Sequence, residues 1–157
     1  ILSSKFNSAY AGATITQNAT DAVNISLRYK RQIYKNFDLG LGLAFDSSRT
    51  FIGREINGVA FAYLNPVPNL MVSYAELFAF YNISDFYIMA AAGTGFSQDA
   101  NFPASFRSAS VIEGGMGWRA SDSFTFEVGY RVVNLTSSYF DTFSQNSLLI
   151  RAGYSFR

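Results

Sequence analysis

The segment FDLGLGLAFD, residues 37–46, alternates strictly between apolar residues and small or acidic ones. Successive side chains of a β-strand point to opposite faces, so the phenylalanines and leucines of this segment would form one apolar row on a strand. On an α-helix, with about 3.6 residues per turn, the same side chains would be spread around the axis. The segment therefore predicts a β-strand with one apolar face and one face of glycine, alanine and aspartate.

The same alternation recurs along the chain and predicts an all-β protein of eight strands. These strands are expected at residues 4–16, 22–34, 37–46, 70–81, 85–96, 108–119, 123–135 and 147–157. The first expected strand consists mainly of small and polar residues. The fourth is apolar on both faces and contains Glu76, so a β-bulge is one interpretation of this strand. The alternative is a count of nine strands, with an additional strand at 58–64, but Pro66 and Pro68 favour a loop there.

The connections between these strands alternate between short and long. Residues 35–36, 82–84 and 121–123 are short connections with turn-forming residues. Long outer loops are expected at about 47–69, 97–107 and 136–146. This pattern places the tight turns at one end and the long loops at the other end of a single domain, residues 1–157.

The composition excludes several classes of protein. The chain has 157 residues, of which 49% are hydrophobic, 17% aromatic and 15% charged; soluble domains carry about 25% charged residues. Cysteine and histidine are both absent, which rules out disulfides, thiolate or histidine metal sites and a Ser-His-Asp triad. The net charge of +1 argues against a nucleic-acid partner, which would require a basic patch.

The apolar rows are expected to face lipid. The most apolar stretch, residues 70–96, is interrupted by Glu76, Asn82 and Asp85, so it does not qualify as a membrane-spanning helix. The polar rows lack the lysines and glutamates of a water-exposed surface, and aromatic residues gather near the strand ends, as in outer-membrane barrels. Because lipid offers no hydrogen bonds to the backbone, we predict a closed, antiparallel, eight-stranded up-and-down transmembrane β-barrel in the bacterial outer membrane.

Two segments carry a resemblance to a known family: FTFEVGYRVVNL at residues 124–135 and RAGYSF at residues 151–156. The chain resembles the small eight-stranded outer-membrane barrels of the OmpA/OmpX and opacity-protein type. This family's C-terminal assembly signal is similar to polar-x-Gly-x-x-aromatic-x-aromatic, and Arg151, Gly153 and Phe156 match its first three fixed positions. Its last aromatic would be residue 158, so the chain either lacks a residue or departs from the signal.

The inward rows predict a charged lumen, because the interior of an eight-stranded barrel is just filled by side chains. The candidate lumen charges are Arg28, Lys30, Asp38, Glu113, Arg119, Glu127, Arg131 and Arg151. A three-residue turn at 121–123 would place Glu113 opposite Arg131. We predict a charged plug that includes this pair; the alternative is a polar lining with no gating role. The inward glycines are interpreted as space for long side chains, rather than as phosphate-binding loops.

An apolar stretch in the long loop 47–69 is a candidate contact for a partner protein or lipid. Its residues are Val59, Phe61, Tyr63 and Leu64. The alternative is a hairpin that extends the barrel wall above the membrane.

Small outer-membrane barrels include enzymes of palmitoyl transfer and lipid deacylation, and a resemblance to them implies a catalytic histidine, which this chain lacks. The sequence therefore predicts a protein that is not an enzyme and has no cofactor. It predicts a structural, interaction or anchoring barrel, which could be a subunit of an envelope complex. The alternatives are a narrow pore or hydrophobic-ligand conduit, and a surface adhesin using its outer loops. The expected partners are outer-membrane lipid and lipopolysaccharide, the barrel-assembly machinery, and another envelope protein.

Overall fold

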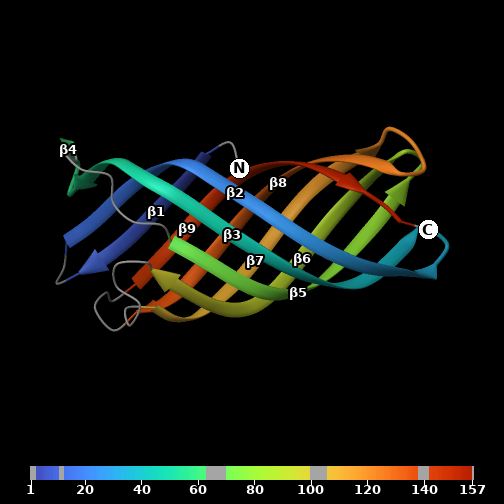
Figure 1. Ribbon diagram of the computed structural model, residues 1–157, viewed down its shortest axis with the longest axis horizontal. Coiled ribbons are helices and arrows are strands. Elements are labelled where there is room, and N and C mark those ends of the chain that lie inside the picture. The colour runs from blue at the N-terminus through green and yellow to red at the C-terminus, as the bar shows by residue number, and fades with distance from the viewer. Residues whose placement is uncertain (1–2, 11–12, 63–69, 100–105, 138–141, 157) are drawn as a thin grey trace.

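The computed structural model describes residues 3–10, 13–62, 70–99, 106–137 and 142–156, almost all of them in antiparallel strands (Figure 1). The strands are β1 (Ser3–Tyr10), β2 (Ala13–Tyr34), β3 (Phe37–Ile56), β4 (Val59–Ala62), β5 (Leu70–Ile83), β6 (Phe86–Asp99), β7 (Phe106–Arg119), β8 (Phe124–Ser137) and β9 (Thr142–Tyr154). Among the residues described, no helix is long and apolar enough to span a membrane.

Eight of the strands form a ring. The order is β2-β1-β9-β8-β7-β6-β5-β3, and an additional antiparallel pairing of β2 with β3 joins the two ends. β4 pairs with β3 alone among the described strands. The predicted fold class, an all-β antiparallel up-and-down barrel of eight strands, is confirmed.

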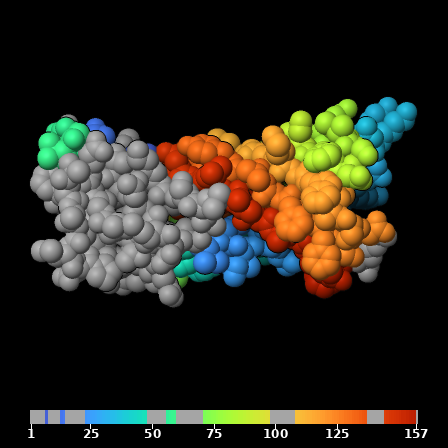
Figure 2. All heavy atoms as spheres, turned by 90° about the horizontal axis from the view of Figure 1, so that it is seen from above, coloured from blue at the N-terminus to red at the C-terminus, as the bar shows by residue number. Residues whose placement is uncertain are grey.

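The two faces of the wall have the predicted polarity. In β3, Leu41 and Leu43 are 65% and 64% exposed, whereas Asp38 and Asp46, on the opposite face, are 7% and 1% exposed. This pattern is the reverse of a water-soluble protein and leaves an apolar outer surface for lipid. Figure 2 shows the outer surface over β7, β8 and β9.

Aromatic side chains cluster on the outer face near the tight-turn ends of β7, β8 and β9. Trp118 stacks against Phe126 with ring centroids 6.3 Å apart. Tyr154 makes edge contacts with Phe124 at 5.1 Å and with Phe156 at 4.9 Å. Aromatic rings at this position form the girdle that such barrels place at the membrane–water interface.

The structure removes the ambiguity of the strand that contains Glu76. β5 pairs with β3 and with β6 without a shift of register, so the bulge left open by the sequence is absent from it. Glu76 points inward and is 2% exposed, in the same row as Val72, Tyr74 and Phe78. The strand is apolar on both faces because its inner side chains pack in the lumen and its outer ones face lipid.

The predicted first strand, residues 4–16, is wrong in its boundaries. The expected strand 4–16 is divided between β1, which ends at Tyr10, and β2, which begins at Ala13. The stretch 17–21, which falls between the expected strands 4–16 and 22–34, is the continuation of β2; Gln17 pairs with Phe6 of β1 and Arg54 of β3. Pairing of residues 17–19 with both neighbouring strands holds this polar segment in the sheet without any apolar alternation.

The strands also extend into the predicted outer loops. β3 and β4 occupy much of 47–69, β6 and β7 shorten the loop 97–107, and β8 and β9 shorten the loop 136–146. The two strands of an antiparallel hairpin satisfy each other's backbone hydrogen bonds. Pairing therefore continues beyond the apolar band, where the sequence no longer alternates.

A ninth strand is present, contrary to the favoured interpretation of residues 58–64. β3 and β4 are joined by Asn57 and Gly58, whose φ angles are 49° and 84°. Positive φ at both positions is the requirement of a type I′ hairpin, for which Asn-Gly is the preferred sequence. The dipeptide was therefore a stronger signal than the prolines that follow.

Ring closure depends on β1, the strand with the least apolar sequence. β1 pairs with residues 13–19 of β2 and 142–148 of β9. Towards the tight turns, residues 21–34 of β2 pair with β3 alone among the described strands. The continuous ring therefore lies in the half of the barrel nearer the long connections.

Candidate functional site in the barrel lumen

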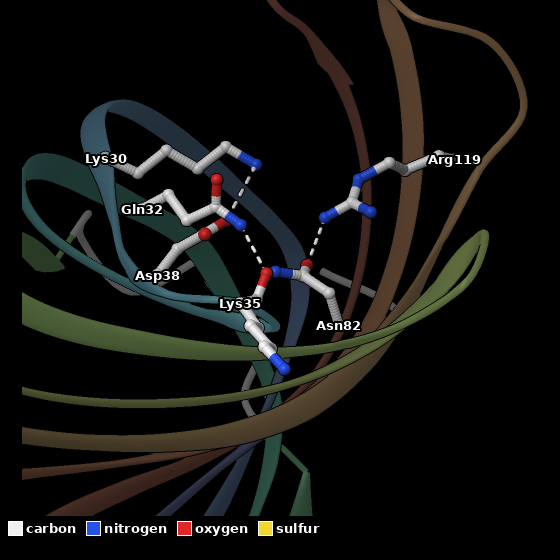
Figure 3. Close-up of a pocket in the computed structure, with 6 residues that line it drawn as sticks. All are labelled: Lys30, Gln32, Lys35, Asp38, Asn82 and Arg119. Atoms are coloured by element: carbon white, nitrogen blue, oxygen red, sulfur yellow. Dashed lines mark hydrogen bonds and ion pairs between the residues drawn. The ribbon is translucent and has the colours of Figure 1, made fainter.

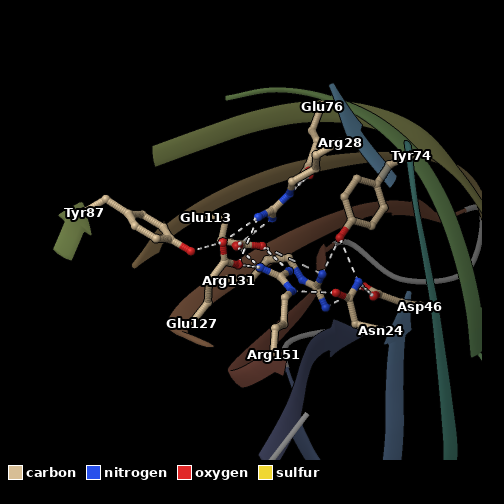
Figure 4. Close-up of polar contacts among 10 residues, drawn as sticks. All are labelled: Asn24, Arg28, Asp46, Tyr74, Glu76, Tyr87, Glu113, Glu127, Arg131 and Arg151. Atoms are coloured by element: carbon tan, nitrogen blue, oxygen red, sulfur yellow. Dashed lines mark hydrogen bonds and ion pairs between the residues drawn. The ribbon is translucent and has the colours of Figure 1, made fainter. Parts of the chain in front are cut away.

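The lumen holds a network of three arginines and four carboxylates, named here the charged layer (Figure 4). Six of the eight barrel strands contribute to it. Its members are Arg28 (β2), Asp46 (β3), Glu76 (β5), Glu113 (β7), Glu127 and Arg131 (β8), and Arg151 (β9). Each lies in an inward row, so strand alternation directs all seven side chains into the lumen. The register and stagger of the strands then bring them to one level of the barrel.

Arg28 is a hub of the charged layer. Its Nε lies 2.9 Å from Glu76 Oε1, and its Nη1 and Nη2 lie 3.0 Å from Glu127 Oε2 and 3.4 Å from Glu113 Oε1. The planar guanidinium presents five N–H donors in fixed directions, which allows one side chain to join three strands across the lumen.

Arg151 contacts the same carboxylates from the other side. It binds Glu113 with two nitrogens: Nη1 donates to Oε1, and Nη2 donates to Oε2 at 2.7 Å. Arg151 Nη1 also lies 3.6 Å from Glu127 Oε2. This two-point geometry is the strong form of an arginine–carboxylate pair.

Arg131 is fully buried, with a side chain that is 0% exposed. Its Nη2 lies 2.6 Å from Asp46 Oδ2, and its Nη1 donates to the Tyr74 hydroxyl. The register places Glu113 directly opposite Arg131, and the two side chains are 4.0 Å apart. Glu113 therefore lies between the two arginines, and it is closer to Arg151 than to Arg131.

Neutral side chains complete the charged layer. Asn24 donates through Nδ2 to Asp46 Oδ1 at 2.6 Å and accepts from Arg151 Nε at 2.6 Å. The Tyr87 hydroxyl donates to Glu127 Oε1 at 2.8 Å. The sequence pattern does not predict these partners, nor the places of Asp46, Glu76 and Tyr74 in the lumen. Two features of the sequence could have predicted them: the position of Asn24 in the inward row, and the single acidic residue, Glu76, in the expected strand 70–81.

Glycines provide the space that the charged layer occupies. A Cβ on Gly42 would lie 2.9 Å from both Cγ and Oε1 of Glu76 and 3.2 Å from Cγ of Arg28. A Cβ on Gly117 would overlap the ring of Tyr87. At these two positions the inward glycines serve as space for large side chains.

Apolar clusters lie on both sides of the charged layer. On the side of the long connections the buried cluster is Ala44, Val72, Tyr74, Ala109, Val111, Val133 and Leu135. On the side of the tight turns it is Phe78, Phe80, Tyr87, Met89 and Ala91. The charged layer is therefore separated from both ends of the lumen by packed apolar side chains.

Lys30 and Asp38 lie apart from the charged layer, at the tight-turn end. Their charged atoms are 3.7 Å apart, and the Lys30 side chain is 42% exposed. They line an open pocket of about 410 Å³ together with Gln32, Lys35, Asn82 and Arg119 (Figure 3). We call this pocket the tight-turn mouth. Of the eight predicted lumen charges, five meet at the centre, Lys30 and Asp38 form a separate pair, and Arg119 lies with that pair at the tight-turn mouth.

The remaining candidate residues lie at the two ends of the barrel. Phe156, in the predicted assembly signal, is 86% exposed, and Gly153 lies beside Thr125. Val59 is 58% exposed in β4, and Phe61 pairs with Arg54. Tyr63 and Leu64 of the predicted partner contact lie outside the described residues. The assembly and contact roles stay predictions.

No family model matches the chain, and no curated protein matches its sequence. Among solved structures, the chain is similar to the outer membrane enzyme PagL, with a TM-score of 0.56 and 9% identity over 94% of this chain and 96% of that one. It is also similar to Ail, the attachment invasion locus protein of Yersinia pestis, with a TM-score of 0.50 and 14% identity over 98% of this chain and 97% of that one. These neighbours confirm the resemblance to small outer-membrane barrels, and the apolar outer wall fits the bacterial outer membrane as the sequence predicts.

The same comparison corrects one conclusion from the sequence. From the absence of histidine, the sequence predicts that the chain is not an enzyme. PagL, a structure with the same fold, is an outer membrane enzyme, and Ail is named for attachment. A fold that carries both kinds of protein does not support that exclusion, which is therefore withdrawn.

Proposed function

We propose that this chain is an outer-membrane barrel with a lumen closed by a charged plug, acting as a structural or interaction protein of the envelope. The observation that carries the proposal is the burial of Glu76, Glu113 and Arg131, whose side chains are each 0% exposed. A conducting pore needs a hydrated path along its axis, whereas these side chains and the apolar clusters beside them occupy the centre of the lumen.

The energetics of buried charge support a permanently closed lumen. Removing one partner of a buried ion pair typically costs about 3–5 kcal/mol, because the other charge is left uncompensated. Opening the lumen would require several such pairs to separate together, since Arg28 and Arg151 share Glu113 and Glu127. The charged layer therefore favours a rigid support for the barrel ends over a gate.

Conductance in planar bilayers tests the closed lumen. We expect the refolded chain to insert without steady ion conductance, and a variant with Arg28, Arg131 and Arg151 replaced by alanine to conduct if it still folds. Heat-modifiable gel migration verifies folding in each case. Steady conductance of the unaltered chain would refute a closed plug and favour the pore.

A role in attachment is the second candidate, and a different observation favours it. β2 and β3 have 22 and 20 residues, against 13 or 14 in β5 to β9, so their ends project with β4 at the end opposite the tight turns (Figure 1). Ail is similar in fold and is named for attachment. Deleting residues 50–62 and closing the strands with a short turn should abolish binding to target cells, while heat-modifiable migration stays unchanged. Full binding by this variant would count against the attachment role.

A further inference from the structure

The charged side chains that line the tight-turn mouth have no part in the closed-barrel function proposed above. Two cationic side chains enter it from opposite walls: Lys30 from β2 and Arg119 from β7 (Figure 3). One carboxylate, Asp38, lines the same pocket, and Lys35 adds a third cation at the rim, with its ammonium directed away from the other two. The pocket therefore carries an excess of positive charge.

Arg119 is held in position by neutral groups. It donates through Nη2 to Asn82 Oδ1 and through Nη1 to the Ser84 carbonyl at 3.3 Å. Its guanidinium also lies 5.3 Å from the centre of the Tyr87 ring. These contacts orient the side chain without neutralising it, so little conformational freedom remains to be lost when an anion binds.

Lys30 lies between an aromatic ring and a carboxylate. Its ammonium lies 5.3 Å from the centre of the Phe80 ring and 3.7 Å from Asp38 Oδ2, which is longer than a hydrogen bond. Phe80 and Tyr87 belong to the apolar cluster below the mouth, so this pocket ends at a packed floor. A dead-end pocket with cationic walls is suited to holding a ligand rather than to passing one.

We propose that the tight-turn mouth binds a small soluble anion that carries phosphate or carboxylate groups, held between Lys30 and Arg119. Arginine and lysine are the side chains that bind such oxygens most strongly. A volume of about 410 Å³ admits a molecule larger than a single phosphate ion. Asp38 opposes the ligand's charge and so limits the affinity.

The test is a titration of the chain, refolded in detergent micelles, with pyrophosphate and separately with succinate. Binding is followed by calorimetry and by the NMR shifts of Arg119 Nε and the Asn82 side-chain amide. We expect Arg119→Gln to weaken binding about tenfold or more, since a charge-assisted hydrogen bond is lost. Asp38→Asn should strengthen binding about threefold by removing a like charge.

Arg31→Gln is the matched control, because Arg31 is exposed on the outer face of β2 beside Lys30 and its loss changes the net charge equally. It should leave the affinity within about twofold of the unaltered chain. The opposite effects of Arg119→Gln and Asp38→Asn separate a binding site from a purely structural role. Folding of each variant is verified by heat-modifiable migration.

Three results would overturn the proposal. One is equal binding by Arg119→Gln and the unaltered chain. Another is an equal loss in Arg31→Gln, which would indicate general charge attraction. The third is a response only to micelles doped with an anionic phospholipid, which would indicate a lipid headgroup instead of a soluble anion. None of these results bears on conductance, so the closed lumen is tested separately.

Discussion

The centre of the lumen and the tight-turn mouth carry the same kinds of side chain in different surroundings. In the charged layer, the side chains of Arg131 and Asp46 are 0% and 2% exposed and 2.6 Å apart. At the mouth, Lys30 and Asp38 are 42% and 10% exposed and 3.7 Å apart. Water and salt screen the second pair but not the first, so burial decides how much each ion pair contributes.

The largest effect is expected from Arg131→Met. The substitution leaves Asp46 buried without its guanidinium partner, and it removes the donor to the Tyr74 hydroxyl. The free energy of unfolding in detergent, measured with urea, should fall by about 3–5 kcal/mol. Arg31→Met on the outer face is the control and should change it by less than about 0.5 kcal/mol. If the free energy of unfolding fell by similarly small amounts in both variants, burial would not explain a difference between charges at the centre of the lumen and charges on the outer surface.

A smaller but still clear effect is expected from Gly117→Ala. The added methyl group would overlap the Tyr87 ring, and this ring must then move from the position in which its hydroxyl donates to Glu127. Overpacking of this kind costs about 1–3 kcal/mol. Gly114→Ala is matched in chemistry and strand, since nothing lies within 4 Å of its Cβ, and should be neutral. Urea unfolding of both variants makes the comparison, and equal stabilities would contradict the packing argument.

Tyr87→Phe isolates the hydroxyl from the ring. Glu127 keeps Arg28 and Arg151 as partners in this variant, so the cost should be lower than that of Arg131→Met. A lost hydrogen bond to a charged group corresponds to about 1.5–3 kcal/mol. If Tyr87→Phe destabilised the barrel as much as Arg131→Met, the arginines would not be the main support of the charged layer.

These contrasts also explain which features of the site could be predicted from the sequence. Glu113 and Arg131 lie on adjacent strands joined by a short turn, so turn length sets their register. Arg28 meets Glu113 and Glu127 across the lumen, from strands that do not pair with its own. Such contacts depend on the tilt and stagger with which the barrel closes, which alternation along one strand does not encode.

The fold was predictable where the wall faces lipid. The segment 37–46 can be recognised as a strand because every second residue faces lipid and is apolar. Beyond the membrane the selection for apolar residues ends, so the polar residues 17–21 of β2 show no alternation, although residues 17–19 pair on both sides. The Asn57-Gly58 turn was visible in the sequence, since its signal is local backbone geometry rather than polarity.

The smallest effect is expected at the mouth, from a double-mutant cycle of Lys30→Gln and Asp38→Asn. The half-exposed Lys30 and the 3.7 Å separation indicate a coupling free energy below about 1 kcal/mol. This coupling should disappear at about 1 M salt, where the screening length falls to about 3 Å. A cycle of Arg131→Met and Asp46→Asn should show a larger coupling that salt leaves unchanged, because solvent ions do not reach the pair. Equal salt dependence in the two cycles would mean that water enters the centre of the lumen as freely as the mouth, and a permanently closed plug would then be excluded.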